Sequence, residues 1–447
     1  MVPVDWLQSN TETSFTEVGT YFVGQSDSFS VQIPVDERIE AASLEISQLI
    51  KNAEIYDGIE NNSYQGHILI SEGVISKISK TSIPYAEKIY DAKGKIVTPG
   101  FIAPDTQIGI IEIGALSVTR DDEASIYNIG FSIHDAFNPN SVLIPWNRAN
   151  GITSAITLPR NTSSPIGGLG SFFLLDSNLD ISSEADIVMI GRFGGSGSSS
   201  RAETLTLIDD MLSFVSSLDK KDISSDASID EVIDDSSLAS HMDFKPRDVK
   251  ALYSLIHDNL PLIIKAHRAS DIIKLIELKN TYDLNLIIMG AQEASLVTDE
   301  IVENNVPLIV NPINNIPNSF DELASNINMT SMLEKAGATL MFNVSRSHNY
   351  HLIRQGAGIA VANGMSYGGA IKALTSNVAK TFNLNNRGSI KVGNMADIVV
   401  WEDDPLEPSS MPEKVFINGL DTDLTTRSTR LRDRYIKDLE KPNTYRN

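Results

Sequence analysis

The sequence has no cysteine among its 447 residues. This absence excludes disulfide bonds, thiolate nucleophiles, cysteine-ligated zinc and iron–sulfur clusters. Histidine is scarce as well, because the chain has seven, so few imidazoles are available to hold a metal ion. No Gly-x-Ser-x-Gly elbow follows a clear strand pattern, which argues against an activated serine nucleophile.

Basic residues are few compared with acidic ones, since 36 Lys+Arg against 58 Asp+Glu give a formal net charge of −22. That balance argues against nucleic acid and anionic membranes as partners, because both require a positively charged surface. No apolar run approaches the roughly 18 residues of a membrane span. Residues 1–20 lack the features of a signal peptide, so we expect a soluble chain. The compartment stays unassigned, and a periplasmic origin is open if a signal was removed.

Short apolar runs separated by turn residues characterise both ends of the chain. Two such runs flank Glu72-Gly73, which is the pattern of an antiparallel hairpin. From Gly100 onward, strand-like runs alternate with longer helical patterns, and this rhythm favours a parallel α/β barrel. Two late runs, Asp397–Trp401 and Val415–Asn418, return to the first pattern.

These patterns divide the chain into several predicted parts. They are an N-terminal arm (1–45), a composite β-sandwich (46–99 and 385–430), a barrel (100–384) with a flexible acidic insertion near 191–245, and a C-terminal tail (431–447). The insertion is predicted to be flexible and solvated because Gly191–Ser200 is rich in Gly and Ser, and because residues 216–240 are rich in Ser and Asp.

Four stretches of sequence carry a resemblance to a known family. They are LIKNAEIYDG at Leu49–Gly58, GHILISEGVISKIS at Gly66–Ser79, DAKGKIVTPGFI at Asp91–Ile102, and GSIKVGNMADIVVWEDDPLE at Gly388–Glu407. With these stretches the chain resembles the amidohydrolase superfamily, near its imidazolonepropionase-like branch. The resemblance covers about Leu49 to Leu420.

The resemblance implies an α/β fold in which a distorted (β/α)8 TIM-type barrel is joined to a small β-sandwich built from both chain ends. Neither group of end strands is large enough to bury a core alone, so the two ends are expected to meet. The resemblance also implies hydrolysis of carbon–nitrogen bonds other than peptide bonds. In such enzymes one or two divalent metals activate the attacking water.

The first metal ligands implied by the resemblance are a His-x-His pair just after the strand at PGFI. Alternation along a strand places residues i and i+2 on one side, so two imidazoles there would face one metal. In this chain the two positions are Asp105 and Gln107. A carboxylate and an amide are hard oxygen donors and suit a tight zinc site poorly.

Three more ligand positions are implied by the resemblance. The histidine expected at the end of the fifth strand is kept as His267. The sixth-strand histidine falls on Met289, whose thioether is a poor ligand for zinc. The eighth-strand aspartate falls among Asn343, Ser345 and Arg346, where no carboxylate is present to accept a proton from water.

We therefore expect no metal or other cofactor. The alternative is a divalent metal such as zinc, bound by Asp105, His267 and His348. The candidate catalytic residues are Lys265 and His267. A lysine desolvated inside a barrel can form a Schiff base or carry a carbamate, but an ion pair of Lys265 with Asp105 or Glu112 is the simpler expectation.

A pocket is expected at the C-terminal ends of the barrel strands. The candidate substrate-binding residues are Asp105, Gln107, Met289, Asn343 and Arg346. Arg192, Arg201 and Arg268 lie near the same strand ends and could bind a ligand carboxylate.

Two hypotheses about function follow. In the first, the protein hydrolyses a non-peptide carbon–nitrogen bond in a small amide, either cyclic or open-chain, although the usual binuclear metal site is largely lost. In the second, it is a catalytically inactive pseudoenzyme that binds a small molecule or acts as an accessory protein. Both hypotheses imply a small-molecule ligand, and both leave homo-oligomerisation and the identity of the substrate open.

Overall fold

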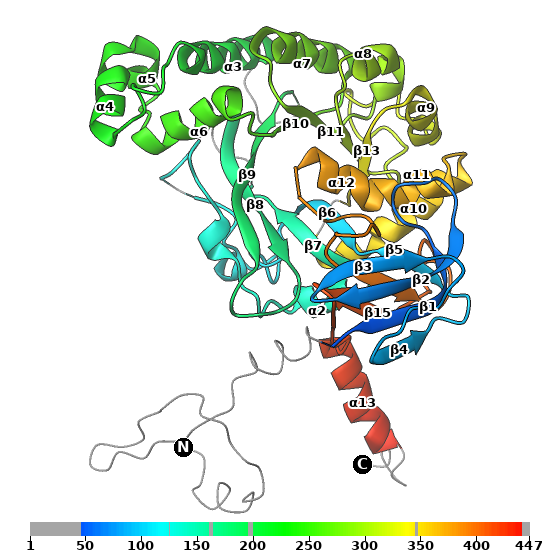
Figure 1. Ribbon diagram of the computed structural model, residues 1–447. Helices are drawn as coiled ribbons and strands as arrows, with labels where there is room; N and C mark the ends of the chain where they lie inside the picture. The colour runs from blue at the N-terminus through cyan, green and yellow to red at the C-terminus, as the bar shows by residue number, and fades with distance from the viewer. Residues whose placement is uncertain (1–45, 125, 161–163, 195–199, 345–346, 440–447) are drawn as a thin grey trace, which may run out of the picture.

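The computed structural model describes residues 46–124, 126–160, 164–194, 200–344 and 347–439, which form two eight-stranded sheets (Figure 1). The predicted arm, 1–45, lies outside the described residues. One sheet contains strands from both ends of the chain, and the other contains the strands between them. No helix in the described part of the chain is long and apolar enough to cross a membrane.

The first sheet joins the two ends of the chain, as the sequence predicted. Its strands are β1 (Gln48–Ile55), β2 (Tyr64–Ser71), β3 (Val74–Ser79), β4 (Lys88–Asp91), β5 (Ile96–Pro99), β14 (Ile398–Trp401), β15 (Pro412–Ile417) and β16 (Leu420–Asp421). Their order is β16-β15-β14-β5-β1-β2-β3, with β4 beside β1. β5 and β14 pair antiparallel, with Thr98 opposite Val399, and buried isoleucines such as Ile50 and Ile398 fill the core of this module.

The second sheet is the barrel. Its strands, in order, are β6 (Phe101–Thr106), β7 (Ile152–Thr157), β8 (Ile166–Leu174), β9 (Ser183–Arg192), β10 (Leu262–Ala266), β11 (Leu286–Gly290), β12 (Leu308–Val310) and β13 (Leu340–Phe342). The outermost strands β6 and β13 come into contact, so the sheet nearly closes. β8 runs antiparallel to β7 and β9, whereas the other neighbours are parallel. This reversal is the distortion of the predicted (β/α)8 barrel.

Helices connect the barrel strands and cover their outer side (Figure 1). They are α2 (Leu143–Arg148), α3 (Arg201–Ser216), α4 (Asp226–Asp235), α5 (Ser237–His241), α6 (Pro246–His257), α7 (Ala269–Tyr282), α8 (Thr298–Glu303), α9 (Met329–Ala336), α10 (Ile353–Ala362), α11 (Tyr367–Leu374) and α12 (Ser376–Thr381). A last helix, α13 (Arg427–Leu439), extends from the strand module and crosses the predicted start of the C-terminal tail.

The predicted flexible insertion near 191–245 requires a correction, because most of its described part is helical. The structure forms α3, α4 and α5 there, and Ile229 and Ile233 of α4 are buried. Ser200 and Ser225 each accept a hydrogen bond from the third residue of the following helix, so serines that suggested a solvated loop act as helix N-caps. Residues 195–199, from the Gly/Ser-rich run, lie outside the described residues.

The barrel and the strand module share a buried joint around Trp401. The indole stacks on Phe101 at a ring-centroid distance of 5.2 Å and donates a hydrogen bond to Thr98 over 2.9 Å. Gly151 lies against the indole with a φ of +87°, and a Cβ there would come within 2.4 Å of the ring. Glycine is needed at this position for both its left-handed backbone and its lack of a side chain.

Arg354 reinforces the joint from α10. The residue is 1% exposed, and its guanidinium lies over the Trp401 ring and donates hydrogen bonds to the carbonyl oxygens of Pro405 (3.2 Å) and Ser410 (2.8 Å). It also donates to Asn150 Oδ1 over 3.2 Å. The buried guanidinium therefore supplies hydrogen bonds to carbonyl oxygens of the loop that follows β14 and connects this loop to the barrel.

We predict that Arg354→Ala destabilises the protein by about 3 kcal/mol, because several buried acceptors lose their donor together. Urea unfolding of Arg354→Ala and of the control Arg427→Ala, which removes an exposed guanidinium on α13, measures the effect. Equal stabilities of the two variants would show that Arg354 does not hold the joint.

Candidate functional site at the barrel mouth

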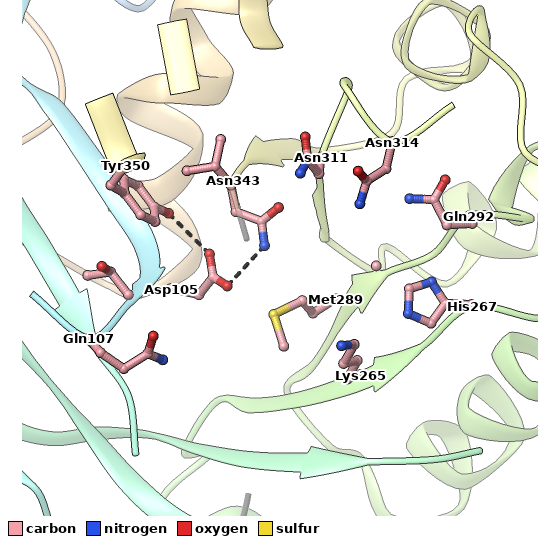
Figure 2. A pocket seen from close by; sticks show the side chains of 13 residues that line it. Asp105, Gln107, Lys265, His267, Met289, Gln292, Asn311, Asn314, Asn343 and Tyr350 are labelled. Carbon is pink, nitrogen blue, oxygen red and sulfur yellow. Dashed lines mark hydrogen bonds between the residues drawn. The ribbon is translucent and has the colours of Figure 1, made fainter. Parts of the chain in front are cut away.

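A cavity of about 210 Å³ opens at the C-terminal ends of the barrel strands (Figure 2). Its lining is mostly polar and consists of Asp105, Thr106, Gln107, Lys265, His267, Met289, Gly290, Gln292, Asn311, Asn314, Asn343, Val344 and Tyr350. The strands themselves are apolar runs, such as LIIKA in β10 and LIV in β12, and polar residues gather where the strands end. Because β6 and β10–β13 point the same way, their polar ends converge on one cavity.

Asp105, near the end of β6, forms the centre of a hydrogen-bonded group. Asn343 Nδ2 donates to its Oδ2 over 2.9 Å, and the hydroxyl of Tyr350 donates to its Oδ1 over 3.1 Å (Figure 2). Burial raises the pKa of the Asp105 carboxyl to about 7, although the two hydrogen bonds and the charge of Lys265 oppose the rise. Asp105 can therefore exchange a proton near neutral pH.

Lys265 and His267 line the cavity from the end of β10. They are two residues apart on an extended backbone, so both side chains leave the strand on the cavity side. Gly290 of β11 has a φ of +94° and packs against the imidazole, because a Cβ there would lie 2.6 Å from His267 Cε1. Burial lowers the pKa of His267, with Glu322 opposing and Lys265 adding to the fall, so the imidazole is mainly neutral at neutral pH.

The loop between β12 and α9 crosses the His267 side of the cavity and is held there by ion pairs. Asp321 accepts from Arg201 Nη2 and from Arg268 Nη2, both over 2.6 Å. Glu293 accepts from the backbone N–H groups of Ala269 (3.0 Å) and Ala324 (3.2 Å). These contacts attach the loop to the N-terminal ends of α3 and α7, and Asn311 and Asn314 at its start line the cavity.

Most of the sequence-derived candidates meet in this cavity. Asp105, Gln107, Lys265, His267, Met289 and Asn343 all line it. Arg346 and Ser345 lie outside the described residues. His348 is exposed and does not line the cavity, so the structure does not bring the alternative zinc ligands together.

Two charged-residue expectations are corrected by the structure. Lys265 forms no ion pair with Asp105 or Glu112 within the described part of the chain, and Glu112 instead accepts from Asn138 Nδ2 and the Val142 N–H. Arg201 and Arg268 do not face the cavity as free cations, because both pair with Asp321.

Sequence reasoning missed seven of the thirteen lining residues. They are Thr106, Gly290, Gln292, Asn311, Asn314, Val344 and Tyr350. Asn311 directly follows β12, and Gln292 follows β11 by two residues, so the rule applied to the other strands would have found both. Tyr350 lies beyond the eighth strand on a short helical turn, and nothing local to its sequence predicts its contact with Asp105.

The donor set around the cavity does not fit the metals that this fold commonly carries. No group of three or more His, Cys, Asp or Glu side chains is arranged to hold a metal ion among the residues described. The carboxylate of Asp105 is occupied by two donors, and most of the remaining polar lining consists of carboxamides. A tight divalent site requires several anionic or imidazole ligands converging on one point.

Comparisons with known proteins agree with the fold. Residues 249–423 match the model of the amidohydrolase family. Amidohydrolase tasK of Hapsidospora irregularis is 22% identical over 393 residues, which cover 79% of this chain and 39% of that protein. The chain thus spans about two fifths of the length of this relative.

Among solved structures, an amidohydrolase from Thermotoga maritima MSB8 has a TM-score of 0.70 and 23% identity, over 84% of this chain and 99% of that one. The ochratoxinase of A. niger has a TM-score of 0.51 and 14% identity, over 84% and 95% of the two chains. At these identities the likeness concerns the fold.

The match of residues 249–423 to the amidohydrolase family model and the likeness of fold over 84% of the chain confirm the resemblance drawn from its motifs. The imidazolonepropionase-like branch stays a prediction.

We predict that Asp105 makes stability depend on pH. Its folded pKa of about 7 exceeds the usual 3.8, so between these values the folded protein binds more protons than the unfolded chain. The free energy of unfolding therefore falls as pH rises through this window. Relative to Asp105→Asn, the wild type should lose stability from about pH 4 to about pH 7 and then level off, as measured by urea unfolding. A difference independent of pH would contradict the assignment.

We also predict that Asp321→Asn loosens the loop between β12 and α9. Losing two partly buried ion pairs should make hydrogen exchange at residues 312–328 about tenfold faster, with a weaker salt dependence than in the wild type. Hydrogen exchange followed by mass spectrometry measures this change. The control is Asp299→Asn, an exposed carboxylate on α8. Unchanged exchange in Asp321→Asn would show that other contacts hold the loop.

Proposed function

We propose that the barrel mouth binds a small amide-bearing molecule through hydrogen bonds from its own side chains, without a resident binuclear metal centre. The observation that carries the proposal is the lining itself, in which five carboxamides stand around a cavity without a converging ligand set in the described residues. Carboxamides offer both a donor and an acceptor, so they pair well with an amide. The pseudoenzyme hypothesis therefore leads.

The size of the cavity supports a small ligand. At about 210 Å³ it lies below the range of roughly 300–1,000 Å³ that is typical of pockets for drug-sized molecules. The relatives named amidohydrolase and ochratoxinase make an amide a natural ligand for this fold, although fold alone does not carry function.

A second candidate function is metal-independent hydrolysis of a non-peptide carbon–nitrogen bond. The pKa of Asp105, about 7, favours it, because a general base works best when its pKa lies near the working pH. Asp105 would take a proton from water as the water oxygen bonds to the amide carbon. It would then pass that proton to the departing nitrogen as the carbon–nitrogen bond breaks.

We predict that purified protein carries well under one zinc, manganese or iron ion per chain by mass spectrometry, whatever metal is supplied during growth. After chelator treatment it should still bind small primary amides, detected by ligand-observed NMR. Asn311→Ala should weaken this binding about tenfold, since it removes a buried donor at the cavity. Asn318→Ala changes an exposed carboxamide of the same loop and should have no effect.

A tightly held metal that disappears in His267→Ala would overturn the proposal and restore the metal-dependent hydrolase. Consumption of an amide or lactam by chelator-treated protein, lost in Asp105→Asn, would instead establish the second candidate. Binding without consumption supports the pseudoenzyme.

A further inference from the structure

Lys265 presents an unmatched positive charge to the cavity. Its side chain is exposed at the barrel mouth, and the structure gives its ammonium group no hydrogen bond or ion pair to any described residue. Arg192 on β9 is its register partner, so the two side chains leave the sheet on the same side. The guanidinium of Arg192 likewise has no hydrogen bond or ion pair to the described residues. Lys265 lines the cavity, whereas Arg192 is not among the lining residues and adds a second positive charge on the neighbouring strand.

The acidic groups near the mouth are already committed to other partners. Both carboxylate oxygens of Asp105 accept hydrogen bonds, from Asn343 and from Tyr350, on the far side of the cavity from His267 (Figure 2). Asp321 pairs with two arginines, and Glu293 accepts two backbone N–H groups. Glu322 accepts from the Asn318 N–H, and its Oε1 lies 3.7 Å from His267 Nδ1. None of these acids forms an ion pair with Lys265, so its ammonium group is available to a ligand carboxylate.

Asn311 and Asn343, which follow the ends of β12 and β13, each keep one half of the side-chain amide without a hydrogen bond to the described residues. Asn311 Oδ1 accepts from the Ile313 N–H over 3.1 Å, which leaves its Nδ2 to donate. Asn343 Nδ2 donates to Asp105, which leaves its Oδ1 to accept. A ligand amide has the matching pair, a carbonyl that accepts and an N–H that donates.

From these contacts we propose that the ligand is a small amide that also carries a carboxylate, with the carboxylate bound by Lys265 and the amide by Asn311 and Asn343. This inference rests on the proposed function and adds the anionic group. The net charge of −22 does not oppose it, because long-range repulsion is screened at physiological salt and the cation of Lys265 lies at the cavity itself.

A matched pair of probes tests the charge requirement. Succinamate has one carboxamide and one carboxylate, whereas succinamide has the same carbon chain and two carboxamides. We expect chelator-treated protein to bind succinamate about tenfold more tightly than succinamide, as NMR titration would measure, since a charge-assisted contact contributes roughly 1.5–3 kcal/mol. Lys265→Gln should abolish the preference, because succinamate should lose about tenfold in affinity relative to succinamide.

Two further variants make the result specific to Lys265. Lys265→Arg keeps a cation and should retain the preference, which shows that the variants fold and that charge is what matters. Lys274→Gln makes the same charge change on the exposed side of α7 and should leave the preference intact.

Equal binding of the two probes, or a preference that survives Lys265→Gln, would overturn the carboxylate assignment while leaving the proposed function in place. Failure of either probe to bind, together with failure of simple primary amides, would overturn the proposed function as well. Preference for succinamide would show that the site rejects anions.

Discussion

The pairing of β5 with β14 is the contact on which the rest of the structure depends. It joins strands from opposite ends of the chain, and neither end has enough strands to bury a core by itself. Once the pair forms, Pro99 leads directly into Phe101 at the start of the barrel, and Trp401 packs on that phenylalanine. Arg354 then fixes the following loop to α10. The module that the two chain ends build is therefore joined to the barrel through Trp401 and Arg354.

Polar groups at the barrel mouth also pair with one another. In a metal site, the ion is the partner that binds the imidazoles and carboxylates around it. Here Asp105 is satisfied by Asn343 and Tyr350, and the loop acids are satisfied by arginines and backbone N–H groups. An amide or hydroxyl donor can replace a metal ion as the partner of a buried carboxylate, although burial still raises the pKa of Asp105. Lys265, whose ammonium group has no hydrogen bond or ion pair to the described residues, marks where a ligand can contribute.

The flexible insertion shows where sequence reasoning failed and why. Its Ser- and Asp-rich composition suggested a solvated segment, yet Ser200 and Ser225 cap helices whose few apolar residues are buried. A helix that covers a barrel needs only a narrow apolar stripe, so Ile229 and Ile233 suffice in a run that is otherwise polar. The overall residue composition of such a segment is polar, so it does not reveal two apolar residues that lie on one face of a helix.

The sequence by itself determined the fold class, the meeting of the two ends and six of the residues that line the cavity. Strand ends are local features, and parallel strands bring their ends together wherever the barrel forms. Only the tertiary structure decided which polar groups satisfy one another. The contact of Tyr350 with Asp105, the capture of Arg201 and Arg268 by Asp321, and the lack of a described partner for Lys265 depend on distances between segments far apart in the chain. Hydrogen bonds and ion pairs act over a few ångströms, and the sequence order of residues does not specify such distances.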